Sequence, residues 1–164
     1  MDSNLKQILW GQFGGCIDML KNAITACDER DWNQPSQFWY NAYHCLFYLD
    51  YYLSEDAASF APPPPFGFSE FDPSGAMPER VYTKEELLNY VHHCRSKCKA
   101  LIAGLNEENA AKRFVNDYRD YSRVEILIYN MRHVQHHVGQ LNLILRQQAD
   151  IGAGWVSRTE ESLF

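Results

Sequence analysis

The sequence predicts an all-α protein: an antiparallel four-helix bundle with a long Pro-rich loop between its second and third helices. Apolar residues recur at spacings of three and four in four separate segments, which is the pattern of amphipathic helices. Each segment is about 20 to 27 residues long, as the helices of a bundle are. Two of the segments open on an S/T-x-x-E capping box, and we expect no strand.

The first predicted helix covers residues 3–28. Its apolar face repeats through Leu5, Leu9, Phe13, Cys16, Leu20, Ile24 and Cys27. Gly11, Gly14 and Gly15 interrupt the pattern, which suggests that a neighbouring segment approaches this helix closely. The second helix is predicted to open at Pro35 and to end near Ser54. It is apolar on nearly every side, so we expect it to be well buried.

The third and fourth helices open on the two capping boxes. Thr83 and Glu86 begin the third helix, and Gly104 ends it. The fourth begins at Ser122 and continues to about residue 148 with an unbroken apolar seam. We expect one domain over residues 1–164.

Two segments lie outside these helices. The loop 55–82 holds most of the prolines and cannot continue a helix. A loop of that length is a lid, a cover over a cavity, or disordered. The loop contains four phenylalanines that can pack on the helices, which favours a cover over a disordered loop. They are Phe60, Phe66, Phe68 and Phe71. The tail 149–164 is expected to fold back on the helices and to bury Trp155.

Composition excludes several classes of function. The chain has a formal net charge of -6 and no Lys/Arg cluster, which argues against binding nucleic acid. Its N-terminus lacks the basic start and apolar run of a secretory signal, and no apolar stretch is long enough to cross a bilayer. We therefore expect a cytoplasmic protein without a membrane partner. The five cysteines show no CxxC spacing, so reduced thiols are expected.

The stretch "HVQHHVGQL" places three histidines within one helix. His133 and His137 are four residues apart and project from one face, beside the main apolar seam. A helix in a bundle touches two neighbours, so this second stripe also faces the interior. His44, in the middle of the apolar second helix, offers a third imidazole. The side chain of His136 points about 100° away from that of His137, so we expect it to lie at the surface or to support a ligand. His92 and His93 lie off their helix's apolar seam, so solvent exposure is expected for both.

Two interpretations of the histidines fit their spacing. Three imidazoles with an open position form the ligand set of a catalytic zinc site, and the set also suits nickel, iron or copper. Alternatively, an HxxxH pair arises by chance, and core histidines bond to a carbonyl or a tyrosine without any metal. Spacing alone leaves both open.

Two segments resemble the DinB superfamily of metal-binding four-helix bundles. "MRHVQHHVGQLNLILRQQ" is similar to that family's last long helix, and "FWYNAYHCLFYLDYYL" resembles its second helix with a single ligand histidine. The resemblance implies that His44, His133 and His137 bind a divalent metal, and zinc or nickel is favoured over iron or copper. The resemblance further implies that Gln140 lies next to a metal ligand and helps to position it. It also implies a homodimer, and a thiol-dependent S-transferase or isomerase activity known in some members.

A metal site of this kind would make a nucleophile from water or a thiol. Zinc peptidases place a glutamate directly after the first histidine, but here that residue is Val134, so peptidase chemistry is not expected. Tyr40, Tyr48 and Tyr129 lie near the ligands and could bind a substrate or simply fill the core. The sequence thus predicts a metal-dependent transferase or hydrolase that joins a low-molecular-weight thiol, or water, to a small electrophile. The alternative is a non-catalytic metal-binding or structural bundle.

Overall fold

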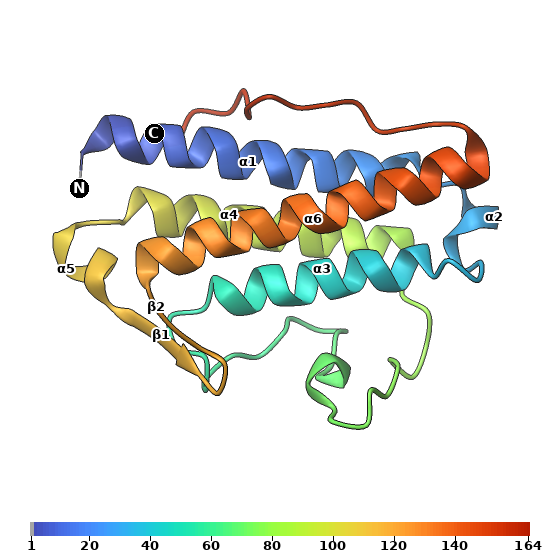
Figure 1. Cartoon of the computed structure of the whole chain (residues 1–164), viewed down its shortest axis with the longest axis horizontal. Helices are drawn as coiled ribbons and strands as arrows, with labels where there is room; N and C mark the ends of the chain where they lie inside the picture. The colour runs from blue at the N-terminus through green and yellow to red at the C-terminus, as the bar shows by residue number, and fades with distance from the viewer. Residues whose placement is uncertain (1) are drawn as a thin grey trace.

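The computed structural model describes residues 2–164, and most of them are helical (Figure 1). The elements in chain order are α1 (Ser3–Ala26), α2 (Glu29–Trp32), α3 (Phe38–Tyr52), the 3-10 helix η1 (Ser69–Phe71), α4 (Lys84–Ala103), α5 (Glu107–Ala111), β1 (Arg113–Asn116), β2 (Arg119–Ser122) and α6 (Arg123–Ala149). The four long helices match the four predicted segments closely. The largest shift is at α3, which begins after Gln37 because this residue adopts a left-handed conformation with φ of 50°.

The four long helices lie side by side, and their directions differ from the prediction (Figure 1). α3 is antiparallel to α6, and α1 is antiparallel to α4. α3 and α4, however, run in the same direction. Two contacts show this: Leu46 contacts Cys94, and one turn further along both helices Asp50 contacts Lys97. The predicted antiparallel arrangement is wrong for this pair and for α1 and α6, which also contact each other and run in the same direction. Residues 53–83 carry the chain back to the end at which α3 began, so α4 starts beside the start of α3.

A β-hairpin joins α5 to α6 and corrects the expectation that the chain has no strand. β1 and β2 pair antiparallel, with Phe114 opposite Tyr121. Phe114 is buried, and its ring lies 5.3 Å from that of Tyr51 and 5.9 Å from that of Tyr52. Each strand has only four residues, which is too short for an alternating pattern to be recognised in the sequence.

The Pro-rich segment between α3 and α4 packs along α3, as a cover would. Phe60 and Phe66 are buried, whereas Phe68 and Phe71 are about half exposed. The ring of Phe71 still packs 4.9 Å from that of Phe47 on α3. The hydroxyl of Tyr43 on α3 donates to the Gly67 carbonyl. Such bonds fix the segment against the helix, so that its side chains can take part in a site on α3.

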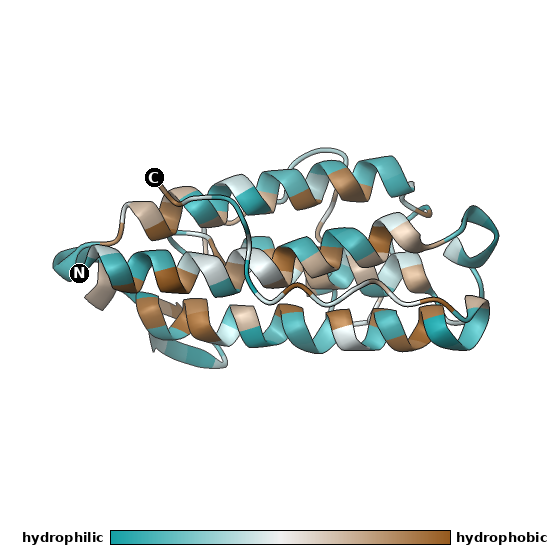
Figure 2. Cartoon of the chain, turned by 90° about the horizontal axis from the view of Figure 1, so that it is seen from above, coloured by the Kyte–Doolittle hydropathy of each residue, from teal (hydrophilic) through white to brown (hydrophobic). Residues whose placement is uncertain are grey.

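The C-terminal tail folds back along α1 toward the N-terminus (Figures 1 and 2). The Thr159 N–H donates to the Gly11 carbonyl over 2.9 Å, and the indole of Trp10 donates to the Glu161 carbonyl over 2.8 Å. The expectation that Trp155 anchors the tail is wrong, because this residue is 74% exposed. The backbone of the tail and the buried side chains of Thr159 and Leu163, rather than its tryptophan, make the contact.

The close contact with the tail explains a glycine of α1. A Cβ atom on Gly14 would lie 2.6 Å from Cγ2 of the buried Thr159. We expect Gly14→Ala to lower the free energy of unfolding by about 1 to 2 kcal/mol, because the overpacking exceeds the gain in helix propensity. Chemical denaturation measures this change. Adding Thr159→Ser, which removes Cγ2 and keeps the hydroxyl, should recover most of the loss.

The matched control for that experiment is Gly139→Ala in α6, where an added Cβ meets nothing within 4 Å. This variant should gain up to about 1 kcal/mol from helix propensity alone. If Gly14→Ala stabilises the protein as Gly139→Ala does, the tail does not pack on α1 as described.

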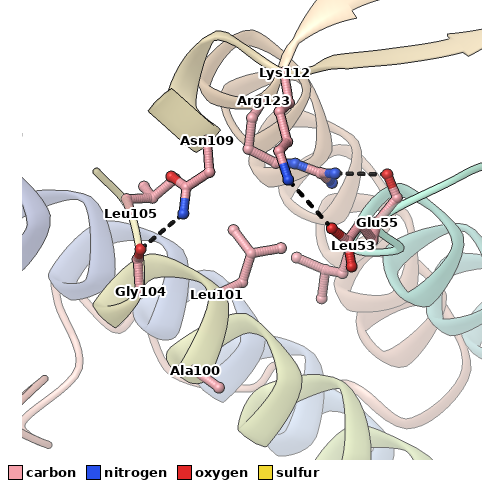
Figure 3. Close-up of a pocket in the computed structure, with 9 residues that line it drawn as sticks. All are labelled: Leu53, Glu55, Ala100, Leu101, Gly104, Leu105, Asn109, Lys112 and Arg123. Carbon is pink, nitrogen blue, oxygen red and sulfur yellow. Dashed lines mark hydrogen bonds and ion pairs between the residues drawn. The ribbon is translucent and has the colours of Figure 1, made fainter. Parts of the chain in front are cut away.

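Arg123 ties the start of α6 to the end of α3 (Figure 3). Its guanidinium is buried and donates to the carbonyls of Ser54 and Glu55 over 2.6 and 2.7 Å. Ser54 and Glu55 lie just beyond the end of α3, and the arginine supplies donors to their carbonyls. A cavity of about 280 Å³ lies beside this contact, between the ends of α3 and α4. It contains none of the predicted site residues.

Two further features concern the hydropathy of the helices and the state of the cysteines. Of the described helices, none combines the length and the apolar character that crossing a membrane requires. All five cysteines are free, and only Cys16 is not fully buried. Burial raises the pKa of Cys16 to about 11, so its thiol stays protonated at neutral pH.

Candidate metal centre

The antiparallel contact between α3 and α6 positions the three predicted histidines. The buried side-chain amide of Asn130 on α6 donates to the Leu49 carbonyl on α3 over 2.9 Å. This bond sets the register of the two helices. His44 lies about one turn before Leu49 on α3, and His133 and His137 lie one and two turns after Asn130 on α6, so the three histidines face one another. The neighbouring seam residues of α6 are fully buried, which turns the histidine stripe toward α3.

The three imidazoles meet at one point. The ring centroid of His44 lies 6.0 Å from that of His133 and 4.9 Å from that of His137, and the latter two lie 4.5 Å apart. One ring nitrogen from each can be chosen so that all three lie within 4.8 Å of one another. Nitrogens around a single ion at about 2.0 to 2.1 Å would be separated by less than this, so small side-chain rotations bring the set to ligand distance.

The electrostatics of the site favour neutral rings. Burial, together with the neighbouring histidines, lowers the pKa of His133 to about 3 and that of His137 to about 4. Both rings are therefore unprotonated at neutral pH, as metal ligands must be. Nδ1 of each is buried and has no hydrogen-bond partner within residues 2–164. A buried polar atom without a partner costs about 1 to 3 kcal/mol, and a cation bound by these rings would compensate. The residues present thus fit a metal ion.

Glu70 completes the site, and the sequence did not predict it. Its carboxylate is 4% exposed, and Oε2 lies 2.6 Å from Nδ1 of His44. When Nδ1 of His44 carries the ring proton and donates it to this carboxylate, the lone pair of Nε2 is free to bind a metal. Glu70 belongs to η1 in the Pro-rich segment. No sequence motif surrounds Glu70, so the sequence alone does not indicate that it contacts His44, which lies 26 residues earlier.

Removing this carboxylate should weaken metal binding without unfolding the loop. We expect Glu70→Ala to lower metal affinity about 10- to 100-fold, because such a partner fixes the tautomer and orientation of the ligand. The loop should remain docked, since the Tyr48 hydroxyl donates to the backbone carbonyl of Glu70. Competition with a chromogenic chelator measures the affinity. Glu79→Ala, an exposed glutamate in the same segment, is the control, and an equal effect in both variants would disprove the role of Glu70.

The histidines form one wall of an open cavity of about 820 Å³. The cavity is lined by His44, Tyr48, Tyr51, Tyr52, Glu70, Phe71, Asp72, Pro73, Asn116, Asp117, Tyr118, Arg119, Tyr129, His133 and His137. Two of the predicted pocket residues, Tyr48 and Tyr129, therefore line it. Tyr40 and Gln140 do not: Tyr40 packs beside His44 outside the cavity, and Gln140 is exposed but close enough to His137 to influence its pKa. The β-hairpin supplies four lining residues that the sequence did not indicate.

The remaining histidines lie outside the site. His92 and His93 are exposed, as predicted, and His136 is exposed as well. His93 lies 3.5 Å from a carboxylate oxygen of Asp50 on the far side of α3, and it does not approach the three imidazoles.

Comparison with protein families decides the family. The family model described as the DinB superfamily matches residues 12–141, which extend from α1 through all three histidines of the site. This chain belongs to the DinB superfamily. The DinB superfamily is typically metal-binding, in agreement with the histidine cluster. No curated protein and no solved structure matches the chain.

Proposed function

We propose that this DinB protein is a divalent-metal-dependent enzyme built on a four-helix bundle, with His44, His133 and His137 as the metal ligands. Zinc and nickel suit three imidazoles best, and iron or copper would also be accepted. The reaction proposed is the transfer of a low-molecular-weight thiol to a small electrophile, or its hydrolysis.

The observation that carries the proposal is the placement of the three imidazoles on the wall of an open cavity. Structural zinc sites are closed by four protein ligands. Here the described residues supply a group of three, and the nearby carboxylate of Glu70 is bonded to His44. A fourth position would therefore face the cavity and remain available to a substrate.

The chain's own residues would bind and orient the reactants. A divalent ion supplies Lewis acidity, which lowers the pKa of a thiol or a water in its open position. Glu70 holds the ring of His44 in the tautomer that a ligand needs. The aromatic side chains of Tyr48, Tyr51 and Tyr52 form an amphipathic wall on which an apolar electrophile can pack.

A transfer assay on untagged protein tests this function. Protein loaded with zinc or nickel is mixed with a panel of low-molecular-weight thiols and 1-chloro-2,4-dinitrobenzene, and the thioether is followed as chloride leaves. An activated ester tests the hydrolytic reaction. We expect metal-dependent turnover that His137→Ala abolishes and that His92→Ala, in an exposed histidine outside the site, leaves unchanged. Fully loaded protein that accelerates neither reaction would contradict the proposal.

The second candidate is a non-catalytic metal-binding protein. It is favoured by the fact that the three rings join α3 to α6, so that an ion among them would crosslink the two helices. Cobalt-substituted protein separates the candidates, because its visible spectrum changes when an external thiol enters an open position. A spectrum that no thiol alters would favour the structural role.

A further inference from the structure

Arg119 differs from most of the other arginines in its partners, and it differs from Arg123 because it donates to no backbone carbonyl of residues 2–164. Four arginines pair with carboxylates, and they are Arg30, Arg80, Arg95 and Arg113. Arg119 is half-buried on the hairpin, and no carboxylate within the described part of the chain lies at ion-pair distance from it. Its single hydrogen bond goes from Nη2 to the Tyr129 hydroxyl over 2.6 Å. Most of the donors of this guanidinium therefore remain available.

Two aromatic rings hold the guanidinium in place. Cζ of Arg119 lies 4.7 Å from the ring centroid of Tyr129 and 5.3 Å from that of Tyr52. An arginine held over aromatic rings loses little further entropy when it binds a planar anion. The residue is thus already oriented before any ligand arrives.

The guanidinium and the histidine cluster belong to the same cavity. The ring of Tyr52 connects them, because its centroid lies 5.9 Å from that of His133 and 5.3 Å from Cζ of Arg119. One small molecule can therefore contact both. Three acidic residues also line the cavity. Asp72 and Asp117 are exposed, so water screens their charge, whereas the buried carboxylate of Glu70 is engaged by His44 on the histidine side of the cavity.

We propose that Arg119 binds the carboxylate of a small substrate whose reactive carbon faces the three histidines. The guanidinium offers two parallel N–H donors, which match the two oxygens of a carboxylate. This inference deepens the proposed function by naming the substrate class, and it rests on that function only for calling the ligand a substrate. Tyr129 accepts the bond from Arg119, so its own proton is left to donate to the same ligand.

Equilibrium binding of matched probes tests the proposal without turnover. Zinc-loaded full-length protein is titrated by calorimetry with 3-phenylpropanoate, 3-phenylpropanol and phenyl phosphate. We expect the carboxylate to bind at least about tenfold more tightly than the alcohol, the value of one charge-assisted hydrogen bond. Arg119→Gln should abolish this preference, Arg119→Lys should retain part of it, and Arg132→Gln, an exposed arginine on α6, should leave it unchanged.

Several outcomes would overturn the proposal. Equal losses for carboxylate and alcohol in Arg119→Gln would show that the arginine only holds the hairpin. Tighter binding of phenyl phosphate would assign a different anion. A preference that survives Arg119→Gln but vanishes after chelation of the metal would mean that the carboxylate binds the ion. Because binding is also measured on metal-free protein, a preference that persists there upholds the role of Arg119 even if the metal-dependent activity fails.

Discussion

His44→Ala, His133→Ala and His137→Ala should each lower metal affinity by more than about 100-fold. This exceeds the range expected for loss of a supporting partner, because each substitution removes one of three ligands. All three variants should remain folded, since none of the three histidines is among the buried residues of α3 and α6. Metal content of untagged protein after dialysis, measured by elemental analysis, gives the result.

The controls for these variants are His92→Ala and His136→Ala, two exposed histidines of which His136 is adjacent to a proposed ligand. Both should bind metal as the unmodified protein does. If His136→Ala loses as much metal as His137→Ala, the ligand set has been assigned wrongly. If His44→Ala alone retains metal, the ion is bound by α6 without α3.

Lys97→Met should lower the free energy of unfolding by about 3 to 5 kcal/mol, a large share of the stability of a single domain. Asp50 on α3 is 0% exposed, and its Oδ1 lies 2.5 Å from Nζ of Lys97 on α4. The hydroxyl of Tyr90 donates to its other oxygen. Removing the lysine leaves the buried carboxylate with only the Tyr90 hydroxyl and the more distant imidazole of His93, which is far more costly than losing an ion pair at the surface. Denaturation by urea at pH 7 measures the loss.

Lys99→Met on the same helix is the matched control. Lys99 pairs with Glu161, and both side chains are partly exposed, so its loss should cost about 1 kcal/mol or less. The double variant Asp50→Leu with Lys97→Met should recover much of the stability, because no buried charge is left. Equal losses in Lys97→Met and Lys99→Met would contradict a buried role for Asp50.

The helices were predictable because their signals are local. Apolar periodicity and the Thr83 capping box depend only on residues within one segment, and the structure contains both bonds of that box. The direction of α4 was not predictable, because it depends on where the 53–83 segment leads. The hairpin was missed because four-residue strands are shorter than any reliable pattern.

In the candidate site, too, some residues were predictable from local signals and others were set by tertiary packing. The spacing of His133 and His137 and the central position of His44 offered three imidazoles, the resemblance to the DinB superfamily implied that they form one site, and the structure brings them together. Whether they bind a metal stays a prediction. Glu70 and Arg119 reach the cavity from a loop and a hairpin, so only tertiary packing reveals them. Both lie in segments to which the sequence assigned no site.

X-ray absorption spectroscopy of zinc-loaded, untagged protein tests the metal centre most directly. We predict one zinc per chain, three imidazole nitrogens at about 2.0 to 2.1 Å, and a fourth light-atom ligand that a sulfur replaces when a thiol is added. His137→Ala should lose this spectrum. A shell containing cysteine sulfur without added thiol, or zinc bound at well below one per chain, would contradict a three-histidine site.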